Sequence, residues 1–370
     1  MRVVVTGANG FIGQNLRLHL EDQGVSDVVR VTRETSAEQR RLSLATADAV
    51  VHLAGVNRPT DPGEFVTGNS ELTQDICNEL LTVGRPVPVV LASSIQAALD
   101  NPYGRSKAAA EDAVMHYSEA SGAGVAILRL ANVFGKWSRP NYNSAVSTFC
   151  HNLARGLPVS ISDPTTELRL VHVDDVVSAI AALLRTGVKT HGRVDVGPVH
   201  DVTLGDLVQM IRECAMNRQT NTIPRVGTGL VRALYATYVS YIPVADFSYS
   251  LRQHADERGV FAEMLRTTDS GQFSFFTAHP GVTRGGHYHH SKTEKFLVVK
   301  GSARFGFRHI VTGERCDLTV HGGDVRVVET VPGWVHDITN VGDDEMFVML
   351  WANENFDPVR PDTVAARVDA

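Results

Sequence analysis

Hydrophobic and polar positions follow a regular alternation in the first part of the chain. Short apolar runs are separated by stretches of helical periodicity, and the runs lie at residues 3–6, 28–32, 49–53 and 87–91. The stretches 11–23 and 71–83 have helical spacing. Continuous apolar runs of this length are typical of parallel strands that are buried on both faces. The alternation therefore predicts an α/β domain, a doubly wound parallel sheet with helices on both faces.

The pattern changes after Pro243. Polar and apolar residues then alternate with a period of two, as at residues 304–308 and 324–327, and glycine-containing turns recur between such runs. Period-two patterning that is broken by turns predicts an antiparallel sandwich or barrel. We therefore expect one domain over residues 1–243 and a second, all-β domain over residues 244–370.

Composition and charge exclude several classes of protein. Hydrophobic residues make up 43% and charged residues 21% of the 370 residues, which is a globular composition. No apolar run is long enough to predict a membrane span, and the chain enters a strand pattern without a signal peptide. A net charge of −6 without a basic block disfavours nucleic acid as a partner. The four cysteines are far apart, which indicates reduced thiols and a cytoplasmic protein.

A glycine-rich loop joins the first predicted strand to the first predicted helix. Glycines in this place permit a tight turn and let backbone N–H groups approach a pyrophosphate at the helix N-terminus. A glycine turn without a ligand is the alternative. The residues that we assign to the cofactor here are Gly7, Asn9, Gly10, Phe11, Ile12 and Gly13.

The end of the second predicted strand bears on which cofactor is used. An acidic residue at this place would bind the ribose of NAD, but Arg33 stands there. A guanidinium suits the 2′-phosphate of NADP through charge-assisted bonds, so we expect NADPH. The alternative is that Arg33 is a solvated surface arginine.

Tyr103 and Lys107 are separated by one helical turn. Asn101-Pro102 predicts a helix start, which places both side chains on one face. A nearby cation stabilises phenolate and lowers the pKa of the phenol, so that tyrosine can exchange protons near neutral pH. Ser94, at the end of a predicted strand, could supply a hydroxyl that polarises a carbonyl.

These motifs resemble the extended short-chain dehydrogenase/reductases that act on nucleotide sugars, over about residues 1–240. The resemblance implies a Rossmann-type fold with Ser94, Tyr103 and Lys107 as catalytic triad. It also implies that Asn132 faces the substrate pyrophosphate and that Arg169 lies near the nucleotide. The cofactor contacts that it adds are Leu53, Ala54, Gly55, Tyr103 and Lys107. One departure is that Ser94 precedes Tyr103 by nine residues, a shorter spacing than the family has, so a loop that covers the site is missing.

Histidines concentrate in the second half of the chain. On a strand, His287 and His289 would point to one face, because the side-chain period is two. Together with Glu294 and His336 they would form a shell of three imidazoles and one carboxylate, which suits a divalent transition metal, and we expect zinc. Histidine pairs two residues apart also occur by accident on surfaces, which is the alternative.

The histidine motif resembles the cupin family, whose first motif fits residues 281–301 without a gap, while the second is matched only over residues 332–340. A second likeness is to the cupin-fold epimerases of 4-keto-6-deoxy nucleotide sugars, through residues 256–263 and 284–287. In those enzymes the histidine that matches His287 is the proton-abstracting base. His287 therefore has two candidate roles, metal ligand or catalytic base, and the sequence does not decide between them.

Both halves of the chain fit one reaction sequence. A ketone at carbon 4 of a sugar acidifies the neighbouring protons, so a base can invert carbon 3 through an enolate. Reduction of the ketone removes that acidity, so epimerisation must precede reduction. The whole chain resembles the bifunctional nucleotide-sugar reductases of capsule and O-antigen synthesis. That resemblance implies epimerisation of a UDP-2-acetamido-2,6-dideoxy-4-hexulose in the cupin and NADPH reduction in the first domain, toward UDP-N-acetyl-L-fucosamine.

Two alternatives belong to other classes of function. The cupin could be a dimerisation or sugar-binding module attached to a plain reductase, but such a module needs no complete ligand shell. The first domain could be a non-catalytic nucleotide sensor, but Tyr103 and Lys107 are intact. We further expect a UDP-sugar as the small-molecule partner and a homodimer as the assembly.

Overall fold

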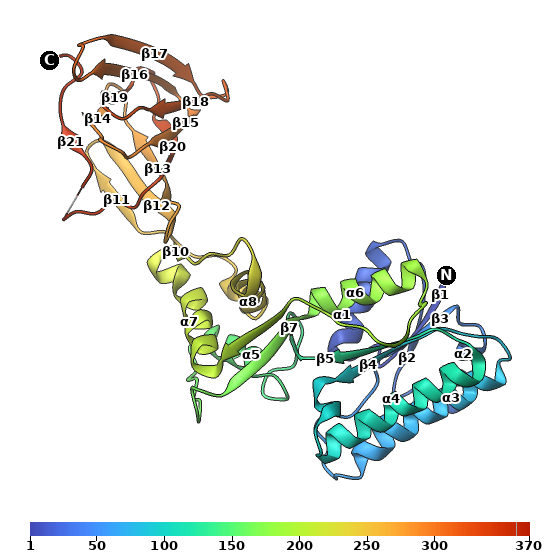
Figure 1. The fold of residues 1–370 in the computed structure, drawn as a ribbon. Helices are drawn as coiled ribbons and strands as arrows, with labels where there is room; N and C mark the ends of the chain where they lie inside the picture. Colours follow the sequence, from blue (N-terminus) through green and yellow to red (C-terminus); the bar gives the residue numbers. More distant parts are fainter. Residues whose placement is uncertain (360) are drawn as a thin grey trace. The chain divides into compact units, whose positions relative to one another are not determined.

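The described part of the chain, residues 1–359 and 361–370 of a computed structural model, divides into two units (Figure 1). The first unit is Met1–Ile211 together with Arg232–Ile242, and the second is Arg212–Val231 together with Pro243–Ala370. The last change of unit therefore falls at Pro243. The segment Arg212–Val231, which the sequence analysis placed in the first domain, groups with the second unit.

A six-stranded parallel sheet forms the centre of the first unit. Its strands lie in the order β2 (Asp27–Val31), β1 (Arg2–Thr6), β3 (Ala49–His52), β4 (Val89–Ser94), β5 (Val125–Leu130) and β8 (His191–Arg193). Val3 and Val5 belong to the core on one face, whereas Val4 belongs to the core on the other. The sheet is therefore buried on both faces, and the predicted Rossmann-type fold is confirmed.

Helices cover both faces of this sheet. α1 (Phe11–Asp22) and α6 (Val173–Thr186) pack on one face, and α2 (Ala37–Ala45), α3 (Leu72–Thr82) and α4 (Pro102–Ser121) pack on the other (Figure 1). A π-helical turn at Val66–Glu71 precedes α3, and a 3₁₀ turn at Ile95–Ala98 precedes α4. β2 lies on one side of β1, and the chain then crosses to β3 on the other side of β1. The loops after β1 and β3 therefore lie next to each other at the crevice where such folds bind ligands.

A small second sheet completes the first unit. It consists of β6 (Asn132–Phe134), β7 (Glu167–His172) and β9 (Val199–Thr203). The first unit also contains α5 (Ala145–Leu153), whereas α7 (Leu204–Thr220) and α8 (Gly229–Val239) are each divided between the two units. No described helix combines the length and the apolar composition that crossing a membrane requires.

The second unit contains two sheets that enclose a common core, as the predicted all-β domain requires. One sheet has the order β10 (Thr222–Ile223), β12 (Gly259–Thr267), β13 (Gln272–Ala278), β20 (Met346–Ala352), β15 (Glu294–Lys300) and β18 (Val327–Thr330), with β11 (Gln253–Asp256) paired to β12. The other has the order β17 (Arg315–His321), β16 (Ser302–His309), β19 (Trp334–Asn340), β14 (Thr283–Tyr288) and β21 (Val364–Ala365). Phe276, Phe296, Phe305 and Ile338 belong to the core between them. The expected cupin-type architecture is confirmed.

One predicted strand is wrong. The alternating residues 324–327 do not form a strand, because the turn at Gly322-Gly323 continues through Arg326 and β18 begins only at Val327. Val325 has a positive φ of 52° and is 82% exposed, which a strand position would not allow.

Candidate functional site

The glycine loop brings the ends of β1 and β3 into direct contact. Gly7 donates its backbone N–H to the Val31 carbonyl at 2.9 Å and adopts a φ of +67°. A Cβ at Gly7 would lie 2.7 Å from the backbone nitrogen of Ala54, and one at Gly13 would lie 2.4 Å from the Gly7 carbonyl oxygen. Both positions therefore require glycine, because no side chain fits between these backbones.

The first turn of α1 is a candidate phosphate site. Gly10 is its N-cap and carries no side chain to satisfy the N–H groups of the following turn. Phe11 and Ile12 pack against the core below, while Asn9 is exposed and its carbonyl accepts a bond from Gln14. The helix N-terminus is thus held rigidly with its amides open to an anion.

Arg33 is exposed immediately after β2, the strand whose last carbonyl binds Gly7. The neighbouring acid, Glu34, accepts a 2.5 Å hydrogen bond from the Thr32 hydroxyl, and this bond lowers the pKa of its carboxyl. A carboxylate already bound to Thr32 is less available to a ribose. The arrangement fits the expected arginine contact to a 2′-phosphate.

A buried chain of hydrogen bonds supports the loop after β3. The Thr6 hydroxyl accepts from the Ala54 amide at 3.2 Å and donates to His52 Nδ1 at 2.6 Å. His52 Nε2 then lies 3.0 Å from the Thr73 hydroxyl, which donates to the Asn69 carbonyl at 2.7 Å. Burial lowers the pKa of His52 to about 3, so the imidazole is neutral and can act as donor and acceptor at once.

Ser94 and Tyr103 meet at the carboxyl end of β4. The 3₁₀ turn spans the short connection, and Asn101 caps α4 by accepting the Gly104 amide at 2.7 Å. The Ser94 side chain lies close enough to the Tyr103 phenol to lower its pKa, and the Phe65 ring packs on Tyr103 with a centroid distance of 5.5 Å. A nine-residue spacing is therefore sufficient to bring the two hydroxyls together.

The pKa of Tyr103 is raised in the structure, and the expected lowering by Lys107 is not seen. Burial raises the pKa of Tyr103, and only the bond with Ser94 opposes this rise. The Lys107 ammonium instead donates to the Ala92 carbonyl at 2.7 Å. Burial lowers the pKa of Lys107 to about 8, while the charge of Glu111 opposes that decrease.

Glu111 is a functional candidate that the sequence analysis missed. Arg129 donates to it through Nε and Nη2 at 2.7–3.1 Å, and the Ser93 hydroxyl donates at 2.5 Å. Burial alone would raise the pKa of Glu111, but these bonds outweigh it and the pKa is lowered. The signal in the sequence was its position one helical turn after Lys107, on the same face of α4.

Asn132 and Arg169 lie side by side on the small sheet. The Asn132 amide donates to the Arg169 carbonyl at 3.0 Å, because β6 and β7 pair at this point. The Arg169 guanidinium is exposed and lies 3.2 Å from a carboxylate oxygen of Asp201. Both predicted substrate residues are therefore exposed and neighbouring.

The four predicted metal ligands come together in the second unit. His287 lies on β14, His289 just beyond it, Glu294 at the start of β15 and His336 on β19, opposite His287 in the strand ladder. One ligand atom from each residue lies within 4.8 Å of the others, and the residues are buried except for the half-buried His287. Burial lowers the pKa of His287 to about 4, which keeps its imidazole neutral.

The hydrogen bonds of two imidazoles fit a cation between them. His289 Nδ1 bonds the Asp362 carbonyl and His336 Nδ1 lies 3.4 Å from the Trp334 carbonyl. Because carbonyls only accept, each Nδ1 carries a proton, and Nε2 is the nitrogen that each ring can offer to an ion. Their Nε2 atoms face Glu294 Oε2 at 3.2 and 3.3 Å. The buried His336 Nε2 has no hydrogen-bond partner among the described residues. Tetrahedral zinc ligands at ordinary bond lengths are separated by about 3.3 Å, so the separation of each Nε2 from Glu294 Oε2 fits such an ion.

Further polar atoms face the interior of the same unit. Lys292, which is 7% exposed, lies 3.3 Å from the other carboxylate oxygen of Glu294. Arg284 pairs with the core residue Ile338 and stacks over the Phe276 ring, and its buried Nε and Nη2 have no hydrogen-bond partner in the described chain. Unsatisfied donors of this kind are costly unless a polar ligand reaches them.

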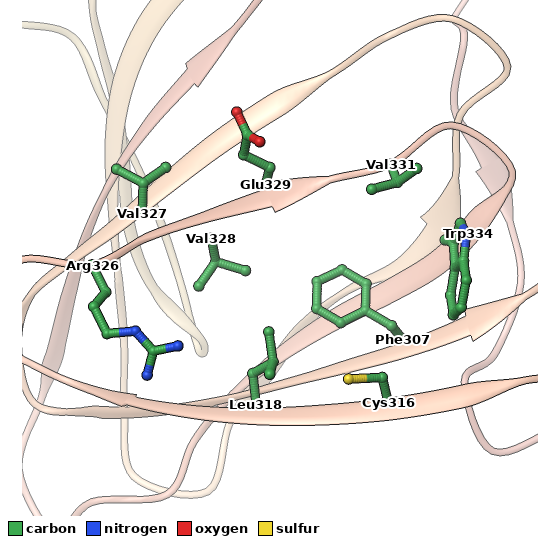
Figure 2. Close-up of a pocket in the computed structure, with 9 residues that line it drawn as sticks. All are labelled: Phe307, Cys316, Leu318, Arg326, Val327, Val328, Glu329, Val331 and Trp334. Carbon is green, nitrogen blue, oxygen red and sulfur yellow. The ribbon is translucent and has the colours of Figure 1, made fainter.

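A separate pocket of about 270 Å³ lies at the open side of the two sheets. Figure 2 shows the rings of Phe307 and Trp334, the sulfur of Cys316 and three valines of β18 and the segment after it around this space. The pocket is lined by residues of β16 and β17, and one of them, Phe307, pairs with the candidate ligand His336 of β19. None of its lining residues is a predicted ligand, so the pocket is not the predicted metal site.

Comparisons with known proteins cover the whole chain. Residues 3–197 match the NAD dependent epimerase/dehydratase family, and residues 254–364 match the polysaccharide biosynthesis C-terminal domain. The UDP-2-acetamido-2,6-beta-L-arabino-hexul-4-ose reductase of Pseudomonas aeruginosa is 53% identical over 100% of this chain and 99% of its own length. The capsular polysaccharide assembling protein CapF of Staphylococcus aureus is 40% identical, and its crystal structure superposes with a TM-score of 0.90 over 99% of this chain and 100% of that chain.

The second unit alone also has a relative. The spore coat polysaccharide biosynthesis protein SpsL of Bacillus subtilis is 25% identical over 30% of this chain and 81% of its own length. The first family match lies within the first unit and the second match lies within the second unit, and both full-length relatives align with the two units together. The chain therefore belongs to the NAD dependent epimerase/dehydratase family, in the branch of CapF-like UDP-2-acetamido-hexul-4-ose reductases that carry a polysaccharide biosynthesis C-terminal domain.

Proposed function

We propose that this chain epimerises carbon 3 of a UDP-2-acetamido-2,6-dideoxy-4-hexulose in its second unit and reduces the ketone at carbon 4 in its first. The observation that carries the proposal is the presence of two complete sets of reactive groups in one chain. Ser94 and Tyr103 meet beside Lys107 at the sheet edge, and three imidazoles and a carboxylate converge in the second unit. The substrate follows from the name of the full-length P. aeruginosa relative.

In the first unit, the cofactor we propose is NADPH, which when bound supplies a hydride to carbon 4. The amides of the first turn of α1 hold its phosphates, and Arg33 binds the 2′-phosphate. Tyr103 donates a proton to the carbonyl oxygen, and Ser94 orients that oxygen through its hydroxyl. Lys107, as an ammonium, stabilises the phenolate that Tyr103 becomes.

In the second unit, a divalent ion, which we propose is zinc, would polarise a carbonyl oxygen when bound. His289, Glu294 and His336 would hold it, because their ligand atoms already lie at suitable separations. His287 is neutral and less buried than the others, which suits both a fourth ligand and the base that removes the carbon 3 proton. Arg284 would bind an anionic or carbonyl group of the substrate through its unsatisfied N–H groups.

The proposal is tested by assaying the two half-reactions separately on the full chain. NADPH oxidation with the 4-keto substrate measures reduction, and deuterium uptake at carbon 3 without NADPH measures proton abstraction. We expect wild type to perform both, and Tyr103→Phe to lose only reduction. Reduction without any deuterium uptake would instead identify a plain reductase with a non-catalytic cupin.

The two roles of His287 are separated by one variant. In His287→Asn, retained metal content with loss of deuterium uptake identifies a base, whereas loss of both identifies a ligand.

The homodimer and the cytoplasmic location expected from the sequence stay predictions.

A further inference from the structure

The last described segment of the chain runs alongside the strand that carries His287. β21 pairs antiparallel with β14, with His287 opposite Ala365 and Tyr288 opposite Val364. The Ala366 amide also donates to the Gly286 carbonyl at 3.0 Å. This segment therefore lies at the metal-ligand cluster, although it follows Glu294 by about seventy residues of sequence.

The Asp362 carboxylate binds the loop between His289 and Glu294. The amides of His290, Ser291 and Lys292 donate to its two oxygens at 2.8, 2.8 and 2.9 Å, and the Ser291 hydroxyl donates at 3.0 Å. Three consecutive amides on one carboxylate determine the conformation of this loop, because charge-assisted bonds of this kind are strong. No other described side chain accepts hydrogen bonds from all three of these amides.

The backbone carbonyl of the same residue acts on a candidate ligand directly. It accepts the hydrogen bond of His289 Nδ1, so Nδ1 carries a proton and the lone pair of Nε2 is the one available to an ion. That Nε2 lies 3.2 Å from Glu294 Oε2 and is the atom that would bind the ion. One residue thus sets both the loop and the tautomer.

We propose that Asp362 is the positioning residue of the metal centre: its carboxylate holds the loop that presents His289, and its carbonyl selects the tautomer that binds the ion. This inference rests on the proposed metal centre and is independent of whether the second unit performs epimerisation. A residue that only stabilised the fold would change the melting temperature without changing the metal affinity. Outer-shell partners of metal-bound histidines, in contrast, change metal affinity by about 10–100-fold when they are lost.

The test compares Asp362→Asn with Asp369→Asn in the full chain. Asparagine is isosteric but loses the charge and one acceptor oxygen, so the His290–Lys292 loop is released. Asp369 lies on the same segment, is exposed and pairs with Arg367, which makes it a matched control. Zinc affinity is measured by competition with a chromophoric chelator, and the coordination sphere by the visible spectrum of the cobalt-substituted protein.

We expect Asp362→Asn to weaken zinc binding by about 10–100-fold and to change the cobalt spectrum, while Asp369→Asn matches wild type. Equal affinity and an unchanged spectrum in Asp362→Asn would overturn the proposal, even if the melting temperature fell. A wild type that binds neither zinc nor cobalt would overturn it as well. Normal metal binding without deuterium uptake at carbon 3 would refute only the proposed epimerase function.

A measurement on wild type keeps the proposal testable if Asp362→Asn does not fold. Long-range ¹H–¹⁵N NMR of the histidine rings in the zinc-loaded protein reports which nitrogen carries the proton and which binds the ion. We expect the Nδ1–H form for His289, identified by the signal that disappears in His289→Gln. An Nε2–H form would contradict the assigned role of the Asp362 carbonyl.

Discussion

Replacement of Glu111 by glutamine removes one charge from behind the reductase site. The Glu111 carboxylate is 5% exposed and lies one turn of α4 after Lys107. Its charge opposes the effect of burial on Lys107, whose pKa is lowered to about 8. With a pKa of about 8, roughly nine-tenths of the molecules carry the ammonium at pH 7. The neutral variant retains similar volume and can still accept from Arg129 through its carbonyl oxygen.

We expect the pKa of Lys107 to fall by about one further pH unit in Glu111→Gln, the low end of the effect of one nearby opposite charge. About half of the molecules would then carry the ammonium at pH 7, and one unit corresponds to about 1.4 kcal/mol. Because a lower pKa means that the ammonium is lost at lower pH, the basic limb of the kcat/KM profile should move toward lower pH. At acidic pH, where Lys107 is protonated in both proteins, the rates should converge.

The assay follows NADPH oxidation with the 4-keto substrate across pH, with Glu119→Gln as control. Glu119 lies on the same helix and is exposed, so its loss should leave the profile unchanged. Loss of charge-assisted bonds to Arg129 is expected to cost about 2 kcal/mol of folding free energy, which thermal melts measure separately. A basic limb that coincides with that of wild type in folded Glu111→Gln would refute the reasoning.

Four further changes have defined outcomes. Tyr103→Phe should abolish NADPH oxidation and leave deuterium uptake at carbon 3 intact, because the phenol serves only the hydride step; loss of both in a folded protein would show that the units are coupled. Arg33→Asp should reverse the preference of kcat/KM for NADPH over NADH, and equal use of both cofactors by wild type would refute the argument. Gly7→Ala should weaken NADPH binding by more than tenfold in titrations, because its Cβ would lie 2.7 Å from the Ala54 nitrogen; unchanged affinity would show that the loop can move. His336→Ala should lower the metal content of the purified protein, and a full equivalent of metal in that variant would exclude His336 as a ligand.

The hydrophobic pattern predicted those helices and strands whose buried residues follow the periodicity of the local sequence. The expected helix 11–23 is observed as Phe11–Asp22, because Leu16 and Leu20 on one of its faces belong to a core. The expected strand at 49–53 is observed as Ala49–His52, because Val50 and Val51 belong to the cores on its two faces. The ligand cluster could be proposed because a spacing of two residues predicts that His287 and His289 point the same way, and because the cupin spacing supplies Glu294 and His336.

Features that depend on distant segments could not be predicted. Asp362 acts on a loop about seventy residues earlier, and no periodicity connects the two. The pKa of Tyr103 could not be predicted from its spacing to Lys107, because burial dominates and the ammonium bonds the Ala92 carbonyl instead. The assignment of Arg212–Val231 to the second unit depends on tertiary packing within that unit.

If the proposed order is right, the chain first exchanges the proton at carbon 3 and then reduces carbon 4. An NMR time course of wild type with a UDP-2-acetamido-2,6-dideoxy-4-hexulose and NADPH in D₂O follows both events at once. We expect a reduced product that carries deuterium at carbon 3 and the hydrogen of NADPH at carbon 4. A reduced product that keeps its original proton at carbon 3 would contradict the proposed order.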